Sequence, residues 1–348
     1  MEVLTFVLSL GTLYSIYVIL AASMELEYGE LGLPNFAKVA FFAVGAFTVG
    51  ALSVRLCATL TGVALEGEFK LRSYYYATLL SARISSNPLL GLTVFLVTLI
   101  VAVPLSMLLG ILASYPALRL REDYLATTLI AFSEILRVIT RNYEPLLGGT
   151  FGAGVVDFLA WLRSPWRELT MLVLCSSLAA GIWFIQYKLS TSPFGRALRA
   201  IRDDELASVA YGKDVAKIRA WTMAIGSGMA SVAGVLYAFY IGSVNPDDFT
   251  VARTFLVVLM VTVGGRGNPY GSLVGAATYL LLDRVMLFIK HNIPLPFDVN
   301  YFSYIILGIL ILVIIVRKPE GLIPERPPLT VKLNKISESN IIQHNTEK

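Results

Sequence analysis

Long runs of apolar residues constrain this chain more than any other feature. One of them, LLGLTVFLVTLIVAVPLSMLLGILAS at 89–114, carries no charge at all. About 20 such residues let a helix cross the hydrocarbon core of a bilayer. Because the runs are continuously apolar and do not alternate with polar residues, a transmembrane β-barrel is disfavoured. The sequence therefore predicts an all-α, polytopic integral membrane protein with about eight to ten transmembrane helices.

Candidate spans recur along most of the chain. They lie at 4–22, 36–54, 89–114, 124–139, 169–187, 220–242, 252–264, 273–289 and 301–316. The spans at 124–139 and 252–264 are short or polar, so we expect them to be tilted, re-entrant or shielded by other helices. Only 15% of the residues are charged, whereas soluble domains average about a quarter.

The distribution of lysine and arginine predicts the orientation, since basic loops stay in the cytoplasm. The loop with the densest basic cluster is 188–219, and we place it inside. Residues 118–123, 264–269 and 315–321 then fall inside too, and 55–88 and 140–168 fall outside. Residues 1–321 form one membrane domain, and 322–348 are expected to be a disordered cytoplasmic tail.

Motifs for catalysis or cofactor binding are absent from the sequence. It contains no G-x-x-x-x-G-K-[ST] stretch for nucleotide phosphates and only two histidines, His291 and His344. Its two cysteines, Cys57 and Cys175, lie in or beside apolar runs, which is not a disulfide framework. We therefore expect no enzyme activity, no catalytic residue, no cofactor and no metal. The basic residues mark cytoplasmic loops, so we expect no nucleic-acid binding.

Small residues recur every four positions in the span 220–242. Gly226, Ala230 and Gly234 form one smooth stripe, and Gly271 and Gly275 repeat the spacing nearby. In lipid such stripes allow close helix packing, because hydrophobicity gives no drive between helices. The alternative is a surface that slides during transport or joins two subunits.

Ionisable residues inside spans are costly and are usually paired or turned inward. Glu134 and Arg137 are spaced i, i+3, so they form a structural pair or line a substrate path. Asp283 and Arg284 are adjacent and face different directions, so we expect them to snorkel or to find interhelical partners. The Gly/Pro-rich turns at 148–154 and 264–271 interrupt helices and are either polar substrate sites or tight surface loops.

The loop at 192–219 is organised as well as charged. Its SPFG turn signal ends the preceding span, and Arg196, Arg199 and Arg202 follow as a basic ridge. The acids at 203–205 suit the positive end of a helix of about eight residues, and Gly212 is placed to cap its other end. The loop is either a solvated, positive-inside segment or a docking element for a cytoplasmic partner.

These residues resemble a known family. The segment SPFGRALRAIRDDELASVAYGKDVAKIRAW at 192–221 is similar to the cytoplasmic loop of permeases of branched-chain amino-acid (LIV-type) ABC importers. Four further segments agree in order: RLREDYLATTLIAFSEILRVI, GGTFG, VTVGGRGNPYGSLVGA and RKPEGLIPER. The departures are Glu122, where the family has glycine, and Asn35 and Lys38 in a segment that usually reads S-L-G-H.

The resemblance implies a non-catalytic, multi-pass permease subunit in a prokaryotic plasma membrane. Its partners would be two cytoplasmic ATP-binding subunits, a homologous or identical second permease and an external substrate-binding protein. The helix near 203–211 would be the coupling helix seated on the ATPase. There Asp203, Asp204 and Glu205 would face the ATPase, flanked by Arg199 and Arg202 and closed by Gly212.

The implied substrates are branched-chain or related amino acids. Asn35, Glu134 and Arg137 are the candidates for the substrate path. The alternatives are a permease for urea or short amides in the same family and a self-contained secondary transporter.

Overall fold

A computed structural model describes residues 2–117 and 122–292, together with 305–306, 308–309, 312–313, 316–318 and 320–325. The described chain is almost entirely helical. Its strands, β1 (Ala153–Gly154) and β2 (Ser243–Val244), are two residues each and pair antiparallel. The all-α prediction is therefore confirmed.

Five described helical segments are long and apolar enough to cross a membrane, which confirms a polytopic membrane protein. They are Val3–Glu30, Lys38–Thr61, Pro88–Pro116, Trp166–Thr191 and Val215–Ile241. Each coincides with a span predicted from an apolar run. The expected span at 301–316 falls largely, and the expected tail beyond 325 entirely, outside the described residues.

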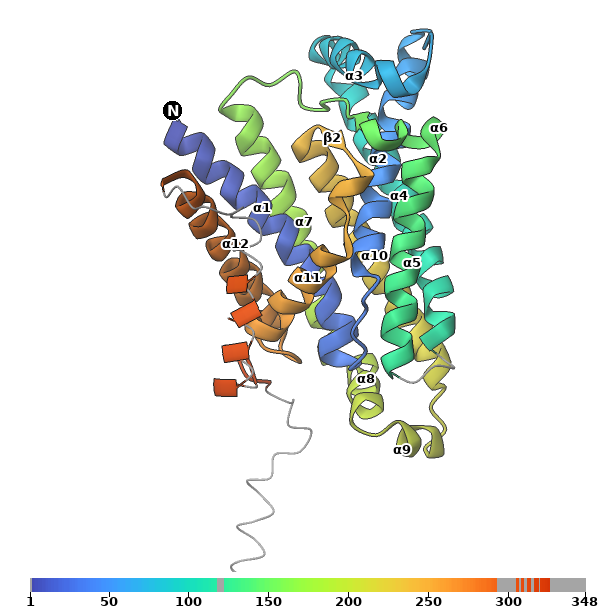
Figure 1. Ribbon diagram of the computed structural model, residues 1–348, viewed down its shortest axis with the longest axis vertical. Helices are drawn as coiled ribbons and strands as arrows, with labels where there is room; N and C mark the ends of the chain where they lie inside the picture. The colour runs from blue at the N-terminus through green and yellow to red at the C-terminus, as the bar shows by residue number, and fades with distance from the viewer. Residues whose placement is uncertain are drawn as a thin grey trace, which may run out of the picture.

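The long helices run back and forth between the two ends of the bundle (Figure 1). The helices are α1 (Glu2–Met24), the π-helix η1 (Glu25–Glu30), α2 (Lys38–Thr61), α3 (Phe69–Ser86), α4 (Pro88–Ala117), α5 (Glu122–Asn142), α6 (Glu144–Leu147), the 3-10 turn η2 (Gly149–Phe151), α7 (Trp166–Thr191), α8 (Pro193–Asp203), α9 (Glu205–Ala210), α10 (Val215–Ile241), the 3-10 turn η3 (Pro246–Asp248), α11 (Val251–Gly264) and α12 (Pro269–Asn292).

Helix α10 lies at the centre of the bundle, in contact with α1, α2 and α4. Its stripe of small residues faces α2 of the same chain. A Cβ atom added to Gly234 would lie 1.9 Å from the carbonyl oxygen of Phe42, and Ala230 is fully buried. Only a residue without a side chain allows this approach of two backbones. The stripe therefore packs two helices within one chain.

The second small-residue pair brings α12 against α11 and the loop between them. A Cβ atom on Gly275 would lie 1.8 Å from the carbonyl oxygen of Met260, and one on Gly271 would lie 2.3 Å from that of Gly265. These close approaches fold α11 and α12 into a tight hairpin.

Two helices begin near the middle of the bundle and not at its ends. The extended segment 31–37 rises from the end of η1 to the start of α2, and the chain after β2 descends to the start of α11 (Figure 1). Helix α11 has 14 residues, so it is about 21 Å long at about 1.5 Å per residue. This is shorter than the ~30 Å hydrocarbon core, as expected for the span at 252–264.

Two regions that were predicted to lie on opposite sides of the membrane lie at opposite ends of the bundle. Helices α8 and α9 lie at one end, and α3 and α6 lie at the other (Figure 1). The region 55–88 contains α3, a helix that was expected to be a loop. It escaped detection because it is amphipathic: its buried residues are Ser73, Tyr76, Ala77, Leu80 and Ile84, which share one helical face.

Candidate functional site

The charged loop forms two helices and not the expected single helix of about eight residues. The SPFG segment, expected to be a turn, starts α8: Ser192 Oγ accepts hydrogen bonds from the backbone N–H groups of Phe194 and Gly195 at 3.1 and 3.4 Å. Pro193 occupies the first turn, where its missing N–H is not needed. A local cap therefore outweighs the turn signal, and α8 continues to Asp203.

Helix α9 has six residues and begins at an acid, as expected. Asp204 is its N-cap, and its Oδ1 accepts a hydrogen bond from the backbone N–H of Ala207 at 2.9 Å. Gly212 follows the helix with a φ of +76°, a conformation that favours glycine. The bond from Lys213 N–H to the Ser208 carbonyl, at 3.1 Å, closes the end.

Helix α9 exposes apolar side chains at the tip of the loop. Leu206 is 83% exposed and Tyr211 is 87% exposed, and Val209 is also exposed. The acids beside them stay at the surface: Asp203 and Asp204 are exposed, and Glu205 binds Arg219 at 2.7 Å. This combination of apolar and acidic groups is suited to contact with another protein.

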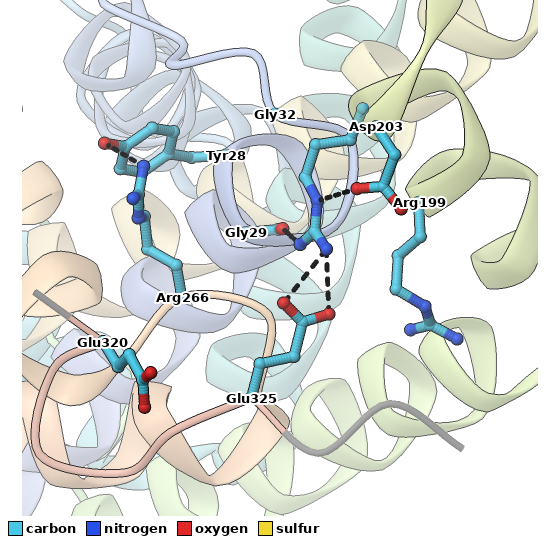
Figure 2. A pocket seen from close by; sticks show the side chains of 9 residues that line it. Tyr28, Gly29, Gly32, Arg199, Asp203, Arg266, Glu320 and Glu325 are labelled. Carbon is cyan, nitrogen blue, oxygen red and sulfur yellow. Dashed lines mark hydrogen bonds and ion pairs between the residues drawn. The ribbon is translucent and has the colours of Figure 1, made fainter. Parts of the chain in front are cut away.

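The two arginines expected to flank the docking surface instead bind groups of the membrane domain, and the contacts of Arg202 can be followed in Figure 2. Arg199 Nη1 donates to the buried carboxylate of Glu30 at 2.7 Å, and only 12% of the Arg199 side chain is exposed. Arg202 donates to the Gly29 carbonyl at 2.6 Å and to both carboxylate oxygens of Glu325 at 2.9 and 3.0 Å. Helix α8 is thus tied to η1 and to Glu325.

These contacts border a charged cavity of about 750 Å³ at the α8 end of the bundle (Figure 2). It is lined by Tyr28, Gly29, Gly32, Arg199, Arg202, Asp203, Arg266, Glu320 and Glu325. Burial of the guanidinium alone would lower the pKa of Arg202, but the carboxylates of Glu325 and Asp203 outweigh it and raise the pKa. The cavity wall is therefore a network of opposite charges.

A buried acidic segment beneath this cavity was missed by the sequence reasoning. Glu25, Glu27 and Glu30 of η1 are all fully buried. Glu27 binds the buried Lys38 ammonium at 2.6 Å, and Glu25 accepts a hydrogen bond from the Gly267 N–H at 2.6 Å. The sequence contains a signal for this burial: ELEYGE directly follows an apolar run, and no turn residue separates the run from the acids. Glu25 and Glu30 find partners in distant parts of the chain, whereas Glu27 is paired with Lys38 at the start of the next helix.

Gly226, on the small-residue stripe, makes room for this acidic segment. A Cβ atom there would lie 2.1 Å from Oε1 of Glu27. The stripe that we expected to pack helices therefore also admits a buried carboxylate at one end.

The candidate substrate-path residues lie in two separate places. Asn35 is buried in the extended segment before α2, where its Oδ1 accepts a hydrogen bond from the Ala37 N–H at 2.9 Å. Its Nδ2 finds no hydrogen-bond partner among the described residues. Glu134 and Arg137 form the expected i, i+3 ion pair on α5. Arg137 also binds Asp247 at 2.6 Å, which ties α5 to η3.

Sites for metals or disulfides are not formed by the described residues. No group of three or more His, Cys, Asp or Glu side chains in the described segments could hold a metal ion. Cys57 and Cys175 are both free and buried.

Comparison with known proteins gives a consistent result. Residues 6–315 match the family model described as branched-chain amino acid transport system, permease component. The chain is 35% identical over 327 residues to the probable branched-chain amino acid transport permease protein LivM of Methanocaldococcus jannaschii, covering 92% of this chain and 94% of the relative. No solved structure matches the chain.

Two bacterial relatives are more distant. The chain is 27% identical to the high-affinity branched-chain amino acid transport system permease protein LivM of Escherichia coli, covering 93% of this chain and 71% of the relative. It is 25% identical to the high-affinity branched-chain amino acid transport system permease protein LivH of Escherichia coli, covering 76% of this chain and 79% of the relative. The chain belongs to the family of permease components of branched-chain amino acid transport systems, and it is a multi-pass plasma-membrane permease subunit of an ABC importer.

Proposed function

We propose that this permease subunit carries branched-chain amino acids, which an external binding protein delivers and two cytoplasmic ATP-binding subunits drive inward. One observation carries the proposal: similarity to a branched-chain amino acid permease extends over 92% of the chain, and the family model matches residues 6–315, a range that contains the charged loop. The function needs no catalytic residue in this subunit, because ATP is hydrolysed in separate subunits.

The exposed face of α9 is the proposed seat of the ATPase. Leu206, Val209 and Tyr211 supply apolar anchors, and Asp203 and Asp204 supply a charged rim. Apolar and aromatic anchors at the centre of a charged rim are typical of protein interfaces. The inward-facing Arg199 and Arg202 then hold α8 against η1, so that a push on α9 reaches the membrane helices.

A second permease subunit, homologous to this one, is part of the proposal. The chain is similar to both LivM and LivH of Escherichia coli, and these two carry the name of one transport system. Two related permeases would surround one substrate path. Each would then supply one charged loop, like that of α8 and α9, to one of the two ATPases.

Reconstitution tests the proposal directly. The chain is co-expressed with candidate ATPase and permease subunits and placed in liposomes with external binding protein. We expect uptake of radiolabelled leucine, isoleucine and valine that requires ATP on the ATPase side. Preferential uptake of urea or acetamide would replace the substrate assignment with the amide alternative.

A second reconstitution, with this chain alone, addresses the secondary transporter. We expect it to show no uptake driven by a proton or sodium gradient. Gradient-driven leucine uptake by the single chain would overturn the ATP-driven function.

A further inference from the structure

A second cavity lies deep in the bundle, away from the charged loop. It has a volume of about 240 Å³ and brings together residues from α1, α2, α11 and α12. Its lining consists of Tyr17, Leu20, Val39, Phe42, Arg253, Leu256, Val257, Met260, Tyr279 and Asp283. This volume is below the ~300 Å³ at which sites for drug-sized ligands begin, so it suits a small ligand.

The first turns of two helices, α2 and α11, form part of the wall of this cavity. Val39 lies in the first turn of α2 and Arg253 in the first turn of α11, and both line the cavity. The hydrogen bond from the Val39 N–H to Thr254 Oγ1, at 3.2 Å, holds the two helix starts together. Helix N-termini carry partial positive charge, and in transporters such half-helices face anionic groups of substrates.

Arg253 supplies a full positive charge at the same place. Its Nη2 donates to the Tyr237 hydroxyl at 3.2 Å, and its guanidinium lies over the Tyr237 and Phe249 rings at 5.2 and 5.7 Å. These contacts position the guanidinium without neutralising it. Asp248 and Asp283 act on Arg253 electrostatically, but no ion pair joins either carboxylate, or any other described one, to this guanidinium. A charge at this depth normally has a counter-ion. A ligand carboxylate would provide one.

Asp283 supplies the opposite charge on the cavity wall. Its described ion pair, with the adjacent Arg284, is 3.9 Å long and therefore weak. The side chain is 39% exposed, so a ligand in the cavity can reach it. Arg253 and Asp283 thus offer one cationic and one anionic group in a single cavity, and they do not bind each other.

The remaining wall consists of six apolar residues and two tyrosines, Tyr17 and Tyr279, whose rings meet edge to face. Leu20, Val39, Phe42, Leu256, Val257 and Met260 surround the space between these charges. A ligand that satisfies the whole cavity must have a carboxylate, an ammonium group and a compact apolar side chain. A free apolar amino acid has all three, whereas urea and simple amides have neither charge.

We propose that this cavity is a transient binding site within the permease for a zwitterionic amino acid with a branched apolar side chain. Arg253 binds the carboxylate at the start of α11, Asp283 binds the ammonium group, and the apolar wall receives the side chain. The assignment rests on the proposed function and adds a site that selects for both charges after the binding protein has released its cargo.

The site is tested with the transporter isolated together with its co-purifying subunits in lipid nanodiscs. Leucine should raise the melting temperature of the complex in a concentration-dependent way, because a ligand that binds only the folded state stabilises it. Leucinamide, which lacks the carboxylate, and 4-methylpentanoate, which lacks the ammonium group, should give no comparable shift.

Four variants locate the effect. Arg253→Gln and Asp283→Asn should each remove the leucine-dependent shift and lower the rate of leucine uptake at least about tenfold, since each leaves one ligand charge unpaired. Lys188→Gln is the control: it removes an exposed charge on α7 that does not line the cavity, and it should keep both the shift and the uptake. Arg253→Lys retains the charge and should keep a weakened shift, which separates loss of binding from misfolding.

Two outcomes would overturn the site. One is a wild-type leucine shift and uptake in both Arg253→Gln and Asp283→Asn; the other is an equal shift with leucinamide. A wild-type complex without any ATP-dependent leucine uptake would instead contradict the proposed function, so the two failures are distinguishable.

Discussion

Helices α8 and α9 are neighbours in the chain, yet their side chains face opposite partners. Asp204 alone separates them. Helix α8 buries Leu198 and Ile201 and sends two arginines into the membrane domain, whereas α9 leaves its apolar residues in contact with solvent. The difference shows that the two helices of this charged loop make different kinds of contact. The first fastens the loop to the bundle, and the second offers a surface to a separate protein.

The largest effect should come from breaking the attachment of α8. Arg199→Met leaves the fully buried Glu30 without its cation, and loss of one partner of a buried ion pair costs about 3–5 kcal/mol. We expect a markedly lower melting temperature of the purified protein. Arg196→Met is the control, because Arg196 is exposed on the same helix; equal destabilisation by both variants would contradict the anchoring role.

The next effect should come from the exposed face of α9. Leu206→Asp replaces an apolar anchor by a charge and should weaken binding of the ATPase subunit at least about tenfold, the scale of an interface hot spot. The melting temperature should not change, since Leu206 contacts solvent in this chain. Leu71→Asp, at an exposed leucine of α3 on the opposite end, should leave ATPase binding intact. Unchanged binding by the Leu206 variant would remove α9 from the interface.

A smaller effect is expected where the two helices meet. Asp204→Ala removes the N-cap of α9, which is typically worth ~1 kcal/mol. Hydrogen exchange monitored by mass spectrometry should become faster in residues 205–211 and stay unchanged in α8. Asp204→Asn keeps a capping oxygen and should behave like the wild type. Faster exchange throughout both helices would mean that α8 and α9 unfold as one unit.

The smallest effect should come from Glu325→Gln at the partly exposed end of the α8 attachment. Exposed ion pairs contribute about 0–1 kcal/mol, and Arg202 keeps its hydrogen bond to the Gly29 carbonyl. We expect a slight fall in melting temperature that disappears at high salt, because salt screens such pairs. A fall as large as that of Arg199→Met would place the main attachment at Glu325.

Local features of this fold were predictable from the sequence. The apolar runs located the five membrane-crossing helical segments, because burial in lipid depends on the composition of each run alone. The Asp204 cap and the Gly212 turn were also predictable, because helix capping joins residues only three or four positions apart. The Glu134–Arg137 pair also lies within one helical turn.

The burial of the η1 acids was not predictable in this way. Glu30 meets Ser190 and Arg199, which lie 160 and 169 positions further along the chain. The inward direction of Arg199 and Arg202 follows from the same long-range contacts. From the sequence these arginines look like solvated, positive-inside residues, and only the tertiary arrangement distinguishes an anchor from an exposed charge.

The contact between α2 and α10 has a mechanical consequence. At Gly234 the two helices meet backbone to backbone, with no side chain between them. Side chains absorb small displacements by changing rotamer, but two backbones in direct contact have no such compliance. A displacement of one helix toward the other is therefore passed on directly to its neighbour. We therefore expect α2 and α10 to move as one unit during transport, with the other helices moving around them.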